Sequence, residues 1–155
     1  MTMQSFELDT LLGFADVLVN NTAARVPLWS ELDKDGKPRT TPEPDNALGI
    51  FIDQWPEELN SMSLTEYPVS DDPSLSESVI GVQVTIWHRD RDVLKAVLSD
   101  VFNAMHGRWG GNIGNVRLVQ ALRRSGANLG QQGNGRVGRT ENYYLTVHRP
   151  SAHRQ

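Results

Sequence analysis

The sequence contains no cysteine. This absence excludes thiolate zinc sites, thiol catalysis and disulfide frameworks, and it fits a protein made in a reducing cytosol. The apolar runs are far shorter than the roughly 20 residues that cross a bilayer as a helix. The first nine residues have no basic start and reach acidic residues before any apolar run, so we expect no signal peptide. We therefore expect a soluble protein that is not exported and has no membrane partner.

The length of 155 residues predicts a single domain that spans 1–155. A chain of this size buries roughly 70% of the surface that its unfolded form exposes, so it can fold without a disulfide or a metal ion. Two stretches with few apolar residues interrupt the chain, at about 31–46 and 125–138, and the second contains five glycines. Such stretches cannot offset the entropy of ordering themselves. We expect both to be flexible loops that become ordered mainly through contacts with other copies or partner proteins.

Charge is unevenly distributed along the chain. Residues 1–78 contain 15 Asp and Glu against 4 Lys and Arg, whereas residues 79–155 contain 4 against 11, and the net charge is −4. Two interpretations remain open: the segregation arises by chance on a solvated surface, or acidic and basic faces of neighbouring copies meet. The second interpretation predicts an interface between copies that includes Asp33, Asp35, Glu43, Asp45, Arg123, Arg124, Arg136 and Arg139.

Two helices are predicted from apolar residues that recur at intervals of three and four. The first covers 5–20, with Ser5 as its N-cap. The second begins after Asp90 or Asp92 and stops at Gly107, because glycine favours the left-handed backbone that ends helices. Each helix therefore has one apolar face for packing against a sheet.

Five strands are predicted, at 49–56, 62–69, 79–88, 116–122 and 142–149. The clearest is 79–88, in which every second residue is apolar, and it should pack against the apolar stripe of the second helix. The strand contributes Ile80, Val82, Val84 and Ile86, and the helix contributes Leu94, Val97, Leu98 and Val101. The element order predicts an α+β fold, with two helices packed on a mostly antiparallel sheet of about four to five strands.

Side-chain patterns for catalysis or nucleotide binding are missing from the sequence. The glycine-rich run 107–114 lacks the Gly-Lys-Ser/Thr of a phosphate loop and follows a helix instead of a strand. No serine lies in a Gly-x-Ser-x-Gly elbow. The run that begins at Asp33 starts like a calcium loop, but its glycine comes too early and the closing glutamate is missing. We expect no enzymatic activity, no catalytic residue and no cofactor.

Histidine spacing also argues against a metal site. His88 and His148 end two predicted strands and would approach each other only if those ends were neighbours. Neither H-x-H nor H-E-x-x-H spacing occurs among His88, His106, His148 and His153. Ordinary surface histidines explain the pattern better, and we expect no metal.

The arginine-rich C-terminal half raises nucleic-acid binding as an alternative function. The sequence pI of about 5.5 and the lack of interleaved aromatic and basic residues argue against it. Arginine is equally favoured at interfaces between proteins. We prefer the interface interpretation, and the nucleic-acid-binding module remains the alternative from a different class.

Five stretches of the sequence carry a resemblance to a known family. They are Gly49-Ile50-Phe51-Ile52 with Trp55-Pro56, Leu64-Thr65-Glu66-Tyr67-Pro68, the run from Gly81 to Asp92, the helix that ends Met105-His106-Gly107, and Arg139-Thr140-Glu141-Asn142-Tyr143-Tyr144-Leu145-Thr146-Val147. These stretches resemble the minor capsid and tail-terminator proteins of long-tailed bacteriophages, and the likeness covers about residues 5–149 in the same order of elements.

The resemblance implies a structural virion protein of the tail or neck. Such a subunit assembles, usually as a hexamer, onto the last ring of the tail tube, stops tube growth and takes part in head-tail joining. Its implied partners are further copies of itself, the tail tube protein and the head-tail connector protein, with nucleic acid at most in the ring lumen. Assembly is expected in the host cytoplasm. Another neck or tail-completion protein is the alternative within this class.

Overall fold

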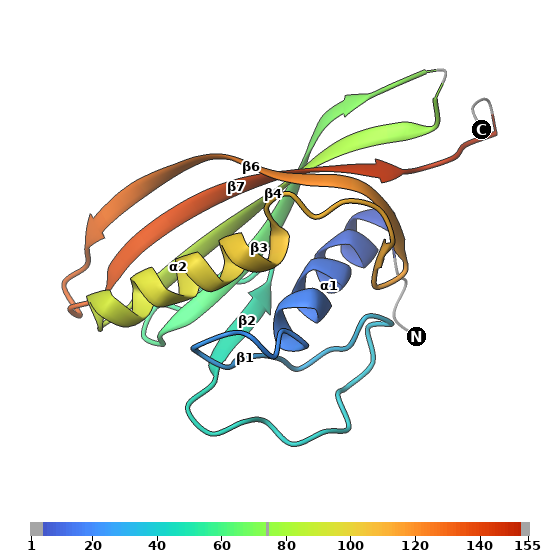
Figure 1. The fold of residues 1–155 in the computed structure, drawn as a ribbon. Coiled ribbons are helices and arrows are strands. Elements are labelled where there is room, and N and C mark those ends of the chain that lie inside the picture. The colour runs from blue at the N-terminus through green and yellow to red at the C-terminus, as the bar shows by residue number, and fades with distance from the viewer. Residues whose placement is uncertain (1–4, 74, 153–155) are drawn as a thin grey trace.

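Residues 5–73 and 75–152 are described by a computed structural model (Figure 1). The predicted α+β class is confirmed. The two helices are α1 (Phe6–Val19) and α2 (Arg91–Met105). The strands are β1 (Leu28–Ser30), β2 (Leu48–Ile52), β3 (Ser61–Asp71), β4 (Glu77–His88), β5 (Asn112–Ile113), β6 (Val116–Gln131) and β7 (Val137–His148).

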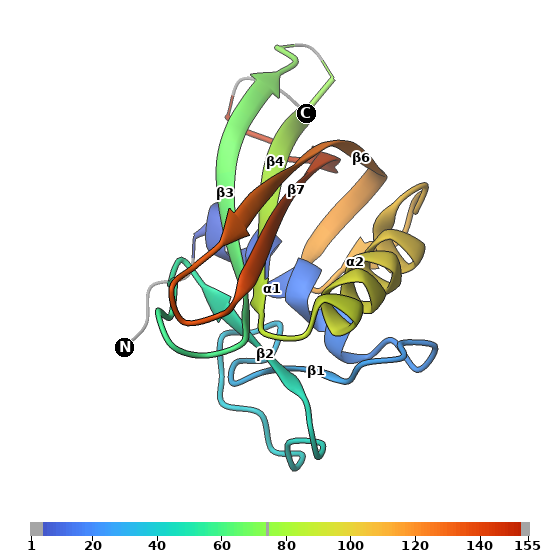
Figure 2. The same ribbon diagram turned by 90° about the vertical axis from the view of Figure 1, so that its left-hand side faces the viewer.

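All seven strands form one sheet in the order β1-β2-β3-β4-β7-β6-β5. The pairs β1/β2 and β2/β3 are parallel, and the remaining pairs are antiparallel. The sheet is strongly curled into a half-barrel, and both helices pack within its curl (Figures 1 and 2). The prediction of four to five mostly antiparallel strands is therefore wrong in number and too simple in pairing. The two missed strands, β1 and β5, have three and two residues, too few to show a period of two.

Both helices begin and end where the sequence predicts. The side chain of Ser5 accepts a first-turn N–H of α1 at 3.1 Å. Of the two caps considered for α2, Asp90 is the one used, and its carboxylate accepts two backbone N–H groups of the first turn. Gly107 follows α2 with a φ of 81°. Local capping chemistry thus fixes the ends of both helices.

The core confirms the predicted register of the central strand. Ile80, Val82, Val84 and Ile86 are at most 3% exposed, and Leu94, Val97 and Val101 of α2 are buried with them. Leu98, which the sequence also assigns to this contact, is only partly buried. Helix α1 supplies the rest of the helical layer, with Leu11, Phe14, Ala15 and Leu18 in the same cluster.

Strands β6 and β7 are longer than predicted. The sequence ends one strand at 122 and begins the next at 142, whereas the structure continues pairing to Gln131 and resumes it at Val137. Residues 124–131 are all exposed and include two glycines, so they give no alternating apolar signal. Pairing with β7 supplies their order instead. The loop over 31–46 is present between β1 and β2, and the flexibility of this loop and of 125–138 stays a prediction.

Gly81 on β4 lies under the ring of Tyr67, its partner on β3. A Cβ at Gly81 would come within 2.2 Å of that ring, whose hydroxyl donates to Asn142 of β7 at 3.1 Å. We expect Gly81→Ala to lower the free energy of unfolding by roughly 1–3 kcal/mol, because the ring must move and give up this bond. Chemical denaturation measures the loss. Gly133→Ala is the control, since a Cβ there meets open space; equal stability of the two variants would contradict the packing described.

Candidate assembly surface

Charge that is segregated along the sequence is also segregated in space. The first half of the chain forms α1 and strands β1 to β3, and the second half forms α2 and strands β4 to β7. Because β3 lies beside β4 in the sheet, the strands of the two halves lie on opposite sides of one seam, whereas α1 packs against β5 and β6 of the second half. Residues 40–88 contain nine Asp and Glu and no Lys or Arg. The subunit therefore has an acidic side that includes β2 and β3 and a basic side that includes β6 and β7, and the basic side is joined by Arg91 and Lys95 of α2.

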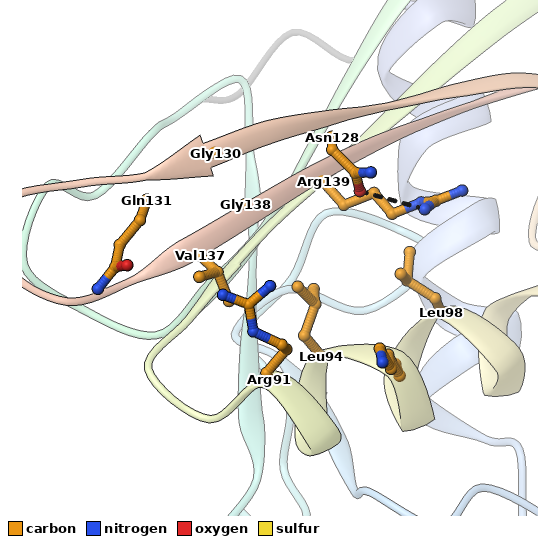
Figure 3. A pocket seen from close by; sticks show the side chains of 10 residues that line it. Arg91, Leu94, Leu98, Asn128, Gly130, Gln131, Val137, Gly138 and Arg139 are labelled. Carbon is orange, nitrogen blue, oxygen red and sulfur yellow. Dashed lines mark hydrogen bonds between the residues drawn. The ribbon is translucent and has the colours of Figure 1, made fainter.

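A groove lies on the basic side, between α2 and the far ends of β6 and β7 (Figure 3). We call it the α2–hairpin groove, and its volume is about 330 Å³. Apolar side chains lie between basic ones along it. It is lined by Arg91, Leu94, Lys95, Leu98, Asn128, Gly130, Gln131, Val137, Gly138 and Arg139.

A second hollow continues along α2 toward its C-terminus and shares Lys95, Leu98 and Arg139 with the groove. It adds Phe102, whose side chain is 39% exposed although it belongs to a helix that faces the core. The basic side thus combines positive charge with accessible apolar surface, a composition suited to a protein partner that carries negative charge.

Two of the predicted interface arginines converge on one carboxylate of their own subunit. Arg123 donates to Glu141 at 2.7 Å and Arg139 donates to it at 3.1 Å, and Glu141 is only 6% exposed. Gly126 leaves room for this arrangement, because a Cβ there would come within 2.2 Å of the Glu141 carboxylate. Each arginine keeps about a third of its side chain exposed. The cluster carries one net positive charge and still faces solvent.

Arg136 and Arg124 differ sharply in exposure. Arg136 is 1% exposed, bonds the side chain of Gln132 at 2.7 and 3.1 Å, and donates to the backbone carbonyls of Pro56, at 3.0 Å, and Leu59. Burial is the main cause that lowers the pKa of its guanidinium. Arg124 is exposed and lies over the ring of Tyr144. Within the subunit Arg136 ties the β6–β7 turn to the segment before β3, and Arg124 faces outward.

The four predicted acidic residues belong to the loop between β1 and β2. Asp33 accepts the N–H groups of Asp35 and Lys37 at 2.9 and 3.0 Å, and the Lys37 N–H is the main cause that lowers its pKa. Asp35 accepts a bond from Asn115 at 2.7 Å, which joins the loop to the turn between β5 and β6. Glu43 and Asp45 are exposed. The interface role of all eight residues stays a prediction.

Sequence reasoning missed the basic residues of α2 and an acidic hairpin tip. Arg91 and Lys95 are four residues apart on the outward face of the helix, a spacing that signals one shared face. The tip joins β3 to β4 and carries Asp71, Asp72 and Glu77 around Leu75, which is 62% exposed. An apolar residue among acids in a turn is the signal that was available.

The structure separates the histidines that might have formed a metal pair. Strands β4 and β7 are neighbours, but they are antiparallel, so His88 lies opposite Val137 and His148 lies opposite Glu77. His153 lies outside the described residues. Over 5–73 and 75–152, no group of three His, Asp or Glu side chains is arranged to hold a metal ion. No helix in these ranges is long and apolar enough to cross a membrane.

The fold has a counterpart among solved structures. No family model matches the chain, and no curated protein matches it. A chain from the structure titled "Virion of native gene transfer agent (GTA) particle" superposes with a TM-score of 0.50 at 15% sequence identity. The match covers 63% of this chain and 77% of that one. The class that fold and comparison define is therefore an α+β half-barrel shared with a chain of a gene transfer agent virion.

Proposed function

We propose that this protein is a structural subunit of a phage-like virion. In this proposal it forms a ring of six copies that caps the tail tube, ends tube growth and offers a surface to the head-tail connector. The observation that carries the proposal is the fold shared with a gene transfer agent virion chain over 77% of that chain. The resemblance of the sequence to tail-terminator proteins supports the particular position in the tail.

The two charged sides of the subunit support assembly as a ring. Contacts between unlike surfaces close into a ring when the rotation from one copy to the next closes, whereas a dimer in which each charged side meets its own counterpart would bring like charges together. Surface ion pairs contribute about 0–1 kcal/mol each, so charge sets orientation and association rate while apolar contacts hold the ring. The exposed apolar residues of the α2–hairpin groove and of the acidic tip are suited to holding neighbouring copies together.

Deletion of the gene for this protein from the genome that directs particle assembly should produce tails of uncontrolled length without attached heads. The physical reason is that tube subunits continue to add when no ring covers the growing end. Negative-stain microscopy of the particles measures the length distribution, and expression of the intact chain in trans should restore it.

Two other outcomes would contradict the terminator role. Tails of normal length without heads would assign the chain to another neck or tail-completion step. Normal particles from the deletion strain, together with a salt-sensitive shift of DNA by the purified protein, would favour the nucleic-acid-binding alternative.

A further inference from the structure

The hairpin of β3 and β4, which ends in the acidic tip, projects from the body of the subunit (Figure 1). The N–H of Leu75 donates to the Asp72 carboxylate at 3.0 Å, and the N–H of Asp72 donates to the carbonyl of Glu77 at 2.9 Å. The hydroxyl of Ser78 donates to Asp71 at 2.5 Å. These bonds hold Asp72 and Leu75 beside the two strand ends, and Leu75 is 62% exposed there.

The α2–hairpin groove lies at the opposite end of the same strands. Glu77 begins β4 beside the tip, and His88 ends β4 just before α2. These residues are 11 positions apart, which is roughly 35 Å along a strand at about 3.3 Å per residue. The groove of one copy is therefore out of reach of its own tip. A tip that occupies the groove therefore has to come from a second copy.

Tip and groove match in both charge and apolar character. Three acids, Asp71, Asp72 and Glu77, surround one exposed leucine on the tip. In the groove, Arg91 and Lys95 lie beside Leu94, Leu98 and Val137, and a third cation, Arg139, is paired with Glu141 of its own subunit. A leucine set among acids is the chemistry that such a groove would accept.

The remaining acidic segments fit the groove less well. The loop over 31–46 has no large apolar residue among those exposed. The segment 53–59 has Trp55 and Leu59 exposed beside acids, but its carbonyls are bonded to Arg136 at the turn next to the groove. That segment therefore already lies beside the groove end of its own subunit, whereas the β3–β4 tip lies at the opposite end of β4.

We infer that the β3–β4 tip of one copy docks in the α2–hairpin groove of the next copy, with Leu75 seated on Leu94 and Leu98. Every copy then offers one tip and fills one groove, which is the head-to-tail contact that a closed ring requires. The inference rests on the proposed ring function and names the contact that builds the ring.

Cysteine cross-linking tests this contact directly, because the chain has no cysteine of its own. The variant with both Leu75→Cys and Leu98→Cys should give a ladder of covalent multimers under mild oxidation, ending at the size of the ring. Either single variant should stay monomeric on a non-reducing gel. Lys95→Cys in place of Leu98→Cys repeats the test at an exposed position, should the Leu98 variant fold poorly.

The matched control keeps Leu75→Cys and moves the second cysteine to Trp109, which is 81% exposed. It should give no ladder. Reversal of charge by Arg91→Glu with Lys95→Glu should lower the ladder yield at least several-fold at low salt, whereas Arg117→Glu should leave it unchanged.

Each remaining outcome overturns the inference. Rings seen by microscopy without a 75–98 or 75–95 ladder would overturn the tip contact and leave the ring function standing. Dimers from Leu75→Cys alone would indicate a self-facing contact instead. No ladder and no ring at any concentration up to about 1 mM would overturn the tip contact, and normal tails in the deletion strain would separately overturn the proposed function.

Discussion

Val84→Asp should destabilise the protein by about 4 kcal/mol or more, a large part of the 5–15 kcal/mol that holds a typical domain folded. Val84 is fully buried in the central strand, between Leu64 of β3 and Glu141 of β7 in the backbone register. Both helices cover this face of the sheet, so a carboxylate there would lack water. The expected result is insoluble or unfolded protein, measured by circular dichroism and urea denaturation.

Two controls separate the effect of charge from that of lost volume. Val84→Ala leaves a small cavity and should cost roughly 1–3 kcal/mol. Gln83→Asp places the same carboxylate one residue away on the opposite, partly exposed face of β4, and should cost less than about 1 kcal/mol. A soluble Val84→Asp protein with the stability of the Gln83→Asp control would show that the register of β4 is wrong.

Arg136→Met should lower the free energy of unfolding by about 2–4 kcal/mol. Replacing a buried charge by an apolar side chain is sometimes neutral, because the cost of desolvating the charge disappears. Here the partly buried carbonyl bonds of Pro56 and Leu59 would lose their guanidinium donor. Carbonyls left without a donor cost up to about 1–3 kcal/mol each, so we expect that loss to dominate.

Hydrogen exchange gives the more specific measurement for Arg136. In Arg136→Met the amides of residues 53–60 and 132–136 should exchange faster, because one side chain joins these two segments. In Arg136→Lys these amides should exchange at rates between those of the unaltered protein and Arg136→Met. An ammonium group lacks the planar fork that bonds Gln132 and the carbonyls together. Arg124→Met is the control, because Arg124 is exposed. Unchanged exchange in Arg136→Met would contradict the role described.

The parts of the fold that the sequence predicted are those with a clear period and a local cap. The strand with Ile80, Val82, Val84 and Ile86 and the helix behind Asp90 carry both signals. The far half of β6 carries neither, because its side chains face solvent and its order comes from hydrogen bonds to β7, residues that follow it in the chain. The parallel pairing of β1 and β2 also gives no sequence signal, since it depends on where the connection 31–47 returns the chain.

The candidate site was predictable only in its charge. Counting residues located an arginine-rich hairpin, but it could not separate Arg136, which is buried, from Arg124, which is exposed. It also missed the groove, because Arg91 and Lys95 on α2 meet Arg139 only when β7 inserts between β4 and β6. The pairing of an acidic tip with a basic groove depends on their positions at opposite ends of β4, which sequence does not reveal.

Helix α1 sets a condition on how the chain can be made. A Cβ at Gly13 would come within 2.3 Å of the carbonyl of Ile113, and Arg149 reaches Glu7 across a separation of 142 residues. Helix α1 precedes these residues in synthesis, and it thus completes its contacts only after Ile113 and Arg149 have been made. Until then Leu11, Phe14 and Leu18 lack their final cover, and such long-range closure slows folding. Synthesis through Arg149 therefore precedes closure of the core, and with it the appearance of a subunit competent to assemble.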